Sequence, residues 1–309
     1  MRAVQCGAPM NRKKGQKIDG WVVLDKPVGL GSTQAVGRVR RLFGAQKAGH
    51  GGTLDPLASG VLPIALGEAT KTVPFVMDGR KEYHFTVRFG EARSTEDAEG
   101  EVTATSAVRP SGEAIHAVLG RFRGEIEQRP PAYSALKVDG RRAYDLARGG
   151  EAVELAPRKV RIDRLELLAR PDVDHADFVV ACGKGTYIRA LGRDLALALG
   201  TVGHLSALRR TAAGPFRETA AISLSKLEAL GHIPPLLGAL APVATALDDI
   251  PALALTDAQA ARLRLGQPVS LTRDAPPSGA LVRAEAGSRL VALVRSDGAS
   301  LQPVRVFNL

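Results

Sequence analysis

The spacing of apolar side chains predicts most of the strands in this chain. Glu82–Phe89 (EYHFTVRF) alternates apolar and polar residues, as a strand with one buried face does. Val160–Leu168 and Asp177–Ala181 are β-like runs separated by polar residues, so we expect them to pair. Gly20–Asp25 and Val61–Leu66 are shorter apolar runs that also predict strands.

Helix-like spacing and helix boundary residues occur in four further segments. The predicted helices are Gln34–Phe43, Ala114–Phe122, Arg141–Ala147 and Tyr187–Leu199. Ser32 or Thr33 suits the start of the first helix, because a short hydroxyl side chain accepts a hydrogen bond from the first turn. Gly200 suits the end of the last one. A mixture of helices and strands in which strands predominate predicts an α+β fold.

The chain is expected to divide into three parts. Residues 1–17 are polar, basic and without periodicity, which predicts a disordered tail. Pro234–Val243 is a proline-bounded stretch of low charge that is expected to lead into a linker. From Ile250 the pattern restarts with short β-like runs at 267–271, 279–283, 290–295 and 301–307. We therefore predict a main domain over 18–249 and a small β domain over 250–309.

Composition excludes several classes of protein. No run approaches roughly 18 uninterrupted apolar residues, so no membrane span is predicted. The first residues lack the apolar run and cleavage site of a secretory signal. Cys6 and Cys182 are the only cysteines, which suits a reducing cytoplasm. They form no metal-ligand cluster, the six histidines are scattered, and no nucleotide-binding motif occurs, so we predict no metal and no cofactor.

The charge distribution indicates a polyanionic partner. The formal net charge is +10, and residues 1–48 contain ten Lys or Arg against two acids, Asp19 and Asp25, which gives +8 for that segment. A basic surface attracts nucleic acid, the commonest soluble polyanion. The alternative is a basic tail followed by a solvated helix face, with no functional meaning.

The densest chemistry lies in residues 47–60 (KAGHGGTLDPLASG). Four glycines in these fourteen residues permit unusual backbone shapes and close approach of another molecule. Asp55 is the one carboxylate among them, and Pro56 biases it toward an extended conformation. This pattern can hold one acid rigidly at the rim of a cleft. The alternative is a tight turn in which Asp55 only caps neighbouring amides.

The same segment carries a family resemblance. Gly49–Pro63 (GHGGTLDPLASGVLP), followed by GEATK at 67–71, closely resembles the catalytic motif of the TruB family of pseudouridine synthases. Four other segments agree in order: DKPVG at 25–29, KEY at 81–83, GKGTYIR at 183–189 and LRRT at 208–211. The resemblance covers residues 18–309. It implies a mixed β-sheet core flanked by helices, with a small C-terminal PUA-like domain.

The resemblance implies isomerisation of uridine 55 in the T-loop of tRNA to pseudouridine. The N-glycosidic bond breaks, the base rotates, and C5 rejoins the ribose, so no atom is gained or lost and no cofactor is required. An ionised aspartate can act as nucleophile or as electrostatic stabiliser while that bond is broken. Two routes stay open at this point, attack at C1′ and proton abstraction at C2′.

The resemblance also assigns residues. It implies three catalytic residues, Asp55, Tyr83 and Arg189. It implies substrate contacts from His50, which would fill the gap left by the flipped base, and from Tyr187 and Leu208, which would line the base pocket. Lys26, Lys47 and Lys71 are candidates for phosphate contacts or loop support. Taken alone, Arg189 would be a surface arginine, Tyr83 a core tyrosine and His50 an exposed loop residue.

The implied partner is the T-arm of tRNA, bound by a cytoplasmic monomer without a membrane, guide RNA or obligatory protein partner. One alternative is a non-catalytic RNA-binding or RNA-folding protein, against which the intact set of Asp55, Tyr83 and Arg189 argues. Another is a sister synthase that acts on ribosomal RNA or within a guide-RNA particle. The His50 motif and the short C-terminal domain favour the stand-alone tRNA enzyme.

The basic N-terminal third predicts a salt-dependent complex with RNA. Each phosphate neutralised by Lys or Arg releases counterions, so log K should fall steeply and linearly with log salt concentration. Filter binding of tRNA between 50 and 200 mM salt, roughly the range over which such slopes are measured, checks this. A flat dependence would contradict an electrostatic RNA interface.

Overall fold

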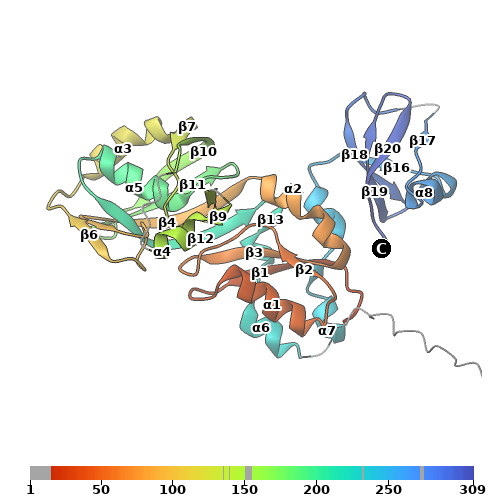
Figure 1. Cartoon of the computed structure of the whole chain (residues 1–309), viewed down its shortest axis with the longest axis horizontal. Coiled ribbons are helices and arrows are strands. Elements are labelled where there is room, and N and C mark those ends of the chain that lie inside the picture. The colour runs from red at the N-terminus through yellow and green to blue at the C-terminus, as the bar shows by residue number, and fades with distance from the viewer. Residues whose placement is uncertain (1–14, 135, 139, 150–154, 232, 272–274) are drawn as a thin grey trace, which may run out of the picture.

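The computed structural model describes residues 15–134, 136–138, 140–149, 155–231, 233–271 and 275–309. Within these residues a long mixed sheet and a smaller second sheet form two bodies, the smaller set to one side of the larger (Figure 1). The long sheet runs in the order β14 (Ile222–Ser223), β1 (Gly20–Lys26), β3 (Ser59–Leu66), β12 (Gly203–Ala213), β4 (Lys81–Phe89), β11 (His175–Cys182), β10 (Arg158–Ala169) and β7 (Gly124–Gln128).

Short strands extend this framework. β2 (Ala48–His50) pairs with β3, β13 (Phe216–Arg217) with β12, and β15 (Leu240–Ala241) with β1. Two hairpins lie outside the sheet, β5 (Glu91–Arg93) with β6 (Val102–Thr105) and β8 (Lys137–Val138) with β9 (Arg141–Arg142). The second sheet has the order β16 (Ala252–Ala254), β18 (Leu281–Ala286), β19 (Arg289–Ser296), β20 (Ser300–Val306) and β17 (Val269–Ser270).

Helices connect and cover the strands. The α-helices are α1 (Ser32–Leu42), α2 (Val73–Asp78), α3 (Gly112–Leu119), α4 (Ala143–Arg148), α5 (Ile188–Ala198), α6 (Leu224–Ala229), α7 (Ile233–Leu237) and α8 (Asp257–Arg264). The 3₁₀ turns are η1 (Gly67–Thr72), η2 (Gly120–Phe122), η3 (Glu218–Ala220) and η4 (Val243–Leu247). In the described part of the chain, no helix has both the length and the apolar character that a membrane crossing requires.

The strand predictions that rest on periodicity are confirmed. β4 alternates buried and less buried residues along its whole length, and β10 pairs with β11 in antiparallel register. β3 is buried on both faces because apolar clusters lie on either side of the sheet: Leu62 packs into one, and Val61 into the other. This explains why its sequence is a continuous apolar run rather than an alternating one. The predicted α+β class is therefore confirmed.

Three local predictions differ from the structure. The N-cap of α1 is Gly31, because the hydroxyl of Ser32 bonds to Leu54 instead of to its own helix. Pro234–Val243 contains most of α7 and the short strand β15, which joins the main sheet by pairing with β1. The central strand β12 was not predicted, because Arg209 and Arg210 interrupt its apolar pattern.

The predicted disordered tail overlaps the described residues only at its end. Residues 1–14 lie outside the described part of the chain. Gln16 forms a β-bridge with Ala45, and its backbone N–H donates to the carbonyl of Gly44 at 2.6 Å. Residues 15–17 are therefore attached to the main body. The domain boundary at residue 250 stays a prediction.

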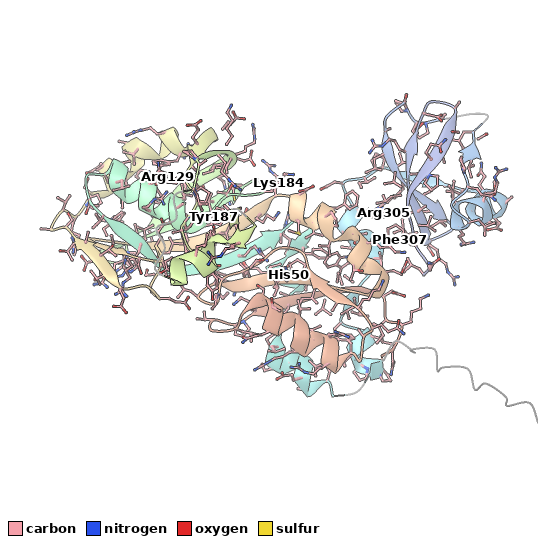
Figure 2. The ribbon with its side chains drawn as sticks, in the orientation of Figure 1. His50, Arg129, Lys184, Tyr187, Arg305 and Phe307 are labelled. Atoms are coloured by element: carbon pink, nitrogen blue, oxygen red, sulfur yellow. The ribbon has the colours of Figure 1, made fainter. Side chains whose placement is uncertain are left out.

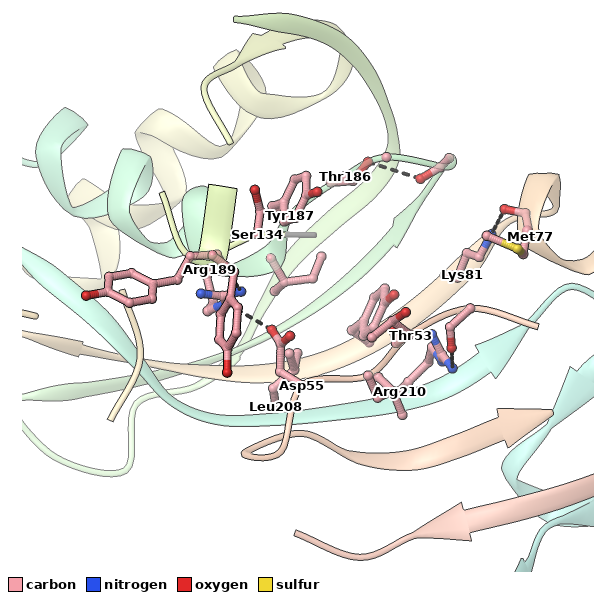
Figure 3. Close-up of a pocket in the computed structure, with 18 residues that line it drawn as sticks. Thr53, Asp55, Met77, Lys81, Ser134, Thr186, Tyr187, Arg189, Leu208 and Arg210 are labelled. Carbon is pink, nitrogen blue, oxygen red and sulfur yellow. Dashed lines mark hydrogen bonds and ion pairs between the residues drawn. The ribbon is translucent and has the colours of Figure 1, made fainter. Parts of the chain in front are cut away.

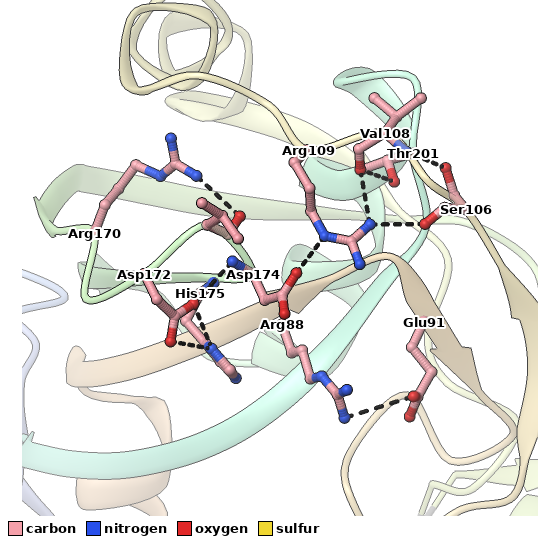
Figure 4. A network of polar contacts seen from close by, with 11 residues as sticks. Arg88, Glu91, Ser106, Val108, Arg109, Arg170, Asp172, Asp174, His175 and Thr201 are labelled. Carbon is pink, nitrogen blue, oxygen red and sulfur yellow. Dashed lines mark hydrogen bonds and ion pairs between the residues drawn. The ribbon is translucent and has the colours of Figure 1, made fainter.

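A polar network fixes the turn between β10 and β11 to the segment that follows β6 (Figure 4). Arg109 forms an ion pair with Asp174 and donates to the Ser106 carbonyl at 2.7 Å. His175 Nδ1 lies 2.9 Å from a carboxylate oxygen of Asp172 in the same turn. None of these side chains lines the pocket described below, so we interpret the network as structural.

The second sheet shares a hydrophobic core with the first. Besides its own apolar cluster, it contributes Leu290, Leu293 and Phe307 to a cluster that contains Trp21 of β1. Phe307 lies where the second sheet meets η1 (Figure 2), and the ammonium of Lys71 lies 5.9 Å from its ring centroid. Packing of this kind couples the stabilities of the two bodies.

Replacement of Phe307 tests this coupling. We expect Phe307→Ala to lower the free energy of unfolding by roughly 3–5 kcal/mol, because it leaves a cavity between the two sheets. Urea unfolding followed by the fluorescence of Trp21, the single tryptophan, reports directly on this cluster. Leu265→Ala, at a side chain that is 75% exposed, is the control and should change stability by less than about 0.5 kcal/mol. An unchanged Trp21 transition in Phe307→Ala would mean that the sheets are energetically independent.

Candidate active site

A cavity of about 420 Å³ opens above the middle of the long sheet (Figure 3). Its walls come from the loop between β2 and β3, the end of α2, the start of β4, the segment that follows β7, α4, the segment before and at the start of α5, and β12. We call residues 51–58 of the first segment the Asp55 loop. Side chains from distant parts of the sequence therefore converge on one pocket.

The glycines of this region are required by close backbone contacts. Gly60 has a φ of +98°, and a Cβ there would lie 2.2 Å from the carbonyl oxygen of Arg210. A Cβ on Gly51 would lie 2.6 Å from the side chain of Val76. Side chains at these positions would push the Asp55 loop away from β12 and α2.

Asp55 and Arg189 form an ion pair at the wall of the cavity. Arg189 Nε lies 3.0 Å from Asp55 Oδ2, and Arg189 is on the first turn of α5. The Arg189 side chain is 8% exposed, whereas that of Asp55 is 39% exposed. A buried, immobile cation thus faces a carboxylate that the cavity reaches.

The guanidinium of Arg189 is held by further acceptors. Nη1 donates to the Thr95 carbonyl at 2.8 Å, and Nη2 donates to the Tyr133 carbonyl at 2.9 Å. The buried carboxylate of Asp97 lies 3.6 Å from Nε. These contacts leave Arg189 little rotational freedom, so the orientation of its fork toward Asp55 is fixed.

Tyrosines and an apolar residue complete the walls. Tyr83 of β4 is nearly buried, and burial raises the pKa of its hydroxyl, although the positive charge of nearby Arg210 opposes that rise. Burial likewise raises the pKa of Tyr187. Leu208 of β12 lines the same cavity. Both hydroxyls are neutral at physiological pH, and the flat rings and apolar wall suit a planar aromatic ligand.

Comparison with known proteins identifies the family. Residues 40–188 match the family model described as TruB family pseudouridylate synthase (N terminal domain). Residues 189–248 match the one described as tRNA pseudouridylate synthase B C-terminal domain. The chain belongs to the TruB family of pseudouridylate synthases. It is therefore an isomerase, and the family expected from the motifs is confirmed.

Relatives within the TruB family match almost the whole chain. A protein of Bradyrhizobium diazoefficiens named tRNA pseudouridine synthase B is 59% identical over 100% of this chain and 91% of its own length. A protein of Rhodospirillum rubrum with the same name is 56% identical over 96% of this chain and 99% of its own length.

Solved structures share the fold. A chain of an H/ACA RNP bound to a substrate RNA containing 2′-deoxyuridine superposes with a TM-score of 0.73 at 26% identity, covering 98% of this chain and 92% of that one. A chain of a Cbf5–Nop10–Gar1 complex gives 0.71 at 29% identity, covering 93% and 84%. The expected pseudouridine-synthase core with a small C-terminal β domain is thus confirmed.

The structure brings five of the nine predicted site residues of this TruB family member to the cavity: Asp55, Tyr83, Tyr187, Arg189 and Leu208. His50 lies outside the lining residues, on β2, where its Nδ1 accepts from the Gly52 N–H at 3.4 Å (Figure 2). Burial and nearby Arg210 lower the pKa of His50 below 6.5. Lys47 directly precedes β2 and is exposed.

The ammonium groups of Lys26 and Lys71 both bond to other parts of the protein. The ammonium of Lys26 is buried and donates to the carbonyls of Leu30 at 2.7 Å and Pro56 at 3.4 Å. Lys71 lies 2.6 Å from a carboxylate oxygen of Glu68 and donates to the Val306 carbonyl at 2.7 Å. Both ammonium groups are engaged within the protein, which agrees with the loop-support alternative; a phosphate contact by either lysine stays a prediction.

Sequence analysis did not assign Arg210, Lys81 or Tyr133 to the site, and it gave no role to Thr95 and Asp97, which lie in a segment that the resemblance places near it. Arg210 and Lys81 line the cavity, and so does Tyr133, whose carbonyl holds Arg189. Asp97 is buried beside Arg189, and the hydroxyl of Thr95 bonds to its carboxylate. Arg210 lies in the LRRT motif and Lys81 in the KEY motif. A charged residue within an otherwise strand-like motif was the feature of the sequence that could have pointed to them. In the described segments, no group of three or more His, Cys, Asp and Glu side chains is arranged to hold a metal.

Lys81, a buried lysine that lines the cavity, should make the stability of the protein depend on pH. Burial lowers the pKa of Lys81 from 10.5 to about 8. Between these values the unfolded chain keeps a proton that the folded chain has released, so the contribution of Lys81 to stability rises with pH. We expect the melting temperature of the wild type to increase relative to Lys81→Met as pH rises through about 8. Lys184→Met, which removes a nearby exposed lysine, is the matched control, and a difference that stays constant up to pH 10 would contradict the shift.

Proposed function

We propose that this chain isomerises uridine 55 in the T-loop of tRNA to pseudouridine and that Asp55 is the nucleophile. The observation that carries the proposal is the 3.0 Å ion pair between Asp55 and Arg189 in the wall of a cavity of about 420 Å³. The relatives named tRNA pseudouridine synthase B support tRNA as the substrate. The RNP structure with substrate RNA supports binding of RNA by this fold.

The proposed chemistry needs only protein groups. The N1–C1′ bond of uridine breaks and a C5–C1′ bond forms, while C5 loses a proton and N1 gains one. The carboxylate of Asp55 attacks the ribose or stabilises its developing charge while the base is detached. Arg189 pairs with this carboxylate and fixes its orientation at the wall of the pocket. The rings of Tyr83 and Tyr187 and the side chain of Leu208 hold the detached base by stacking and apolar contact.

Access to the cavity requires the target base to leave its stack. Flipping costs a few kcal/mol, and a side chain that fills the vacated gap offsets part of that cost. His50 is our candidate for this role. Its lowered pKa supports the assignment, because a neutral imidazole is desolvated more easily than a charged one when it enters the stack.

The remaining assignments complete the proposal. Residues 18–249 form the catalytic domain and residues 250–309 form a PUA-like domain that contacts tRNA away from the target base. This second domain carries seven Arg against four acids over residues 251–309, a net charge of +3, which suits an RNA surface. The enzyme acts as a cytoplasmic monomer without cofactor, guide RNA or protein partner.

Asp55→Asn tests the function. It keeps size and hydrogen bonding but removes the charge, so turnover should fall below detection while the affinity for tRNA changes less than about tenfold. Release of tritium from tRNA labelled at C5 of uridine measures turnover, and filter binding measures affinity. Asp249→Asn, at an exposed aspartate outside the cavity, should keep wild-type turnover.

The outcome also separates the alternatives. Substantial turnover by Asp55→Asn would exclude this residue as the nucleophile. Tight tRNA binding by a wild type that releases no tritium would favour the non-catalytic RNA-folding protein. Turnover on ribosomal RNA but not on tRNA would favour the sister synthase.

A further inference from the structure

Two buried polar side chains hold the Asp55 loop without contacting Asp55 itself. The first is Ser32, at the start of α1, which is 5% exposed. Its hydroxyl accepts from the N–H of Leu54 at 2.8 Å and donates to the carbonyl of the same residue at 2.8 Å. Both polar groups of the residue before Asp55 are thus fixed by one side chain. Ser32 does not line the cavity.

The second is Arg210, near the middle of β12, which is 1% exposed. Its Nε donates to the Val61 carbonyl at 2.7 Å, and Nη2 donates to the Gly52 carbonyl at 3.1 Å. Nη1 reaches the Thr53 carbonyl at 3.4 Å, as seen beside Asp55 in Figure 3. One guanidinium therefore joins the front half of the loop to the strand that follows it.

Arg210 also connects the loop to β4. It is the cross-strand neighbour of Tyr83, and its positive charge opposes the rise that burial causes in the pKa of the Tyr83 hydroxyl. Burial of an ion is costly, and an apolar side chain of similar volume would pack the sheet at least as well. A planar fork with several donors can, however, tie together carbonyls from different segments in one geometry. The need to order the irregular backbone of the Asp55 loop therefore explains why an arginine is buried at position 210.

The loop requires such support because it has little regular structure of its own. It lies between β2 and β3 and contains glycines that allow many backbone conformations in an unsupported chain. Reacting groups must be held within roughly 0.5 Å of their productive position. A loop free to move by more than this would separate Asp55 from Arg189 and from the ribose.

We propose that Ser32 and Arg210 are positioning residues of the isomerisation, which set the place of Asp55 through its backbone. The expected effect on the reaction rests on the proposed function, whereas the ordering of the loop by these two side chains does not depend on it. Ser32 orders the loop in the free protein and does not line the cavity. Its loss should therefore reduce kcat and leave KM unchanged.

Ser32→Ala is compared with a matched control. Ser296 of β19 is 3% exposed, donates to the Pro276 carbonyl at 2.6 Å and accepts from the Gly298 N–H at 3.1 Å. It is thus bonded to backbone as Ser32 is, but in the second sheet. We expect Ser32→Ala to lower kcat on saturating tRNA at least tenfold with KM within twofold, and Ser296→Ala to keep wild-type kcat. Both should lower the melting temperature similarly.

Arg210→Lys provides the second arm. A lysine ammonium keeps the charge but cannot reach the carbonyls of Gly52, Thr53 and Val61 together, so kcat should fall at least as far as in Ser32→Ala. If circular dichroism shows that Arg210→Lys does not fold, the Ser32 and Ser296 pair decides alone.

Hydrogen exchange gives a readout that does not depend on activity. The peptide that contains Leu54 should exchange faster in Ser32→Ala and Arg210→Lys than in the wild type, whereas Asp55→Asn should exchange as the wild type does. An inactive wild type would overturn the proposed function, and exchange would still decide this inference. Unchanged exchange of that peptide in Ser32→Ala, or wild-type kcat in that variant, would overturn the positioning role.

Discussion

The ion pair between Asp55 and Arg189 is the contact on which the arrangement of the site depends. It joins a glycine-rich loop to the first turn of α5, and these segments are far apart in the sequence. β12 and β4 lie between β3, which follows the loop, and β11, which precedes α5, so these two strands set the distance across which the pair forms. The long sheet therefore serves as a rigid spacer, and its buried apolar faces supply the stability that holds the spacing.

Buried cations recur around this pair, each with a different task. Arg189 faces the carboxylate, Arg210 joins the Asp55 loop to β12, and Lys26 fixes the end of that loop through the Pro56 carbonyl. Irregular backbone leaves carbonyl oxygens without partners from a helix or sheet, and a buried cation satisfies several of them at once. Positive charge near the site thus orders the protein as well as suiting an anionic substrate.

The GEATK segment at 67–71, which is part of the family motif, contacts the second sheet instead of the cavity. Glu68 and Lys71 do not face the cavity; they bond to the last residues of the chain and hold the second sheet against η1. Together with the core shared by Trp21 and Phe307, these contacts hold the second sheet against the first. A motif can therefore be shared by a family because it assembles two bodies, not only because it touches substrate.

The sequence by itself determined the features that depend on local order. Alternation over β4, the pairing of β10 with β11, the helix ended by Gly200, and the loop around Asp55 could be predicted because periodicity and glycine placement act within a few residues. Only the tertiary structure decided which polar groups meet. It showed that Ser32 supports Leu54 instead of capping its helix and that the arginine-interrupted β12 is a central strand. It also showed that the ammonium groups of Lys26 and Lys71 donate to carbonyls within the protein. The physical reason is that a polar side chain bonds to whichever partner the fold brings within reach, and that partner lies far away in the sequence.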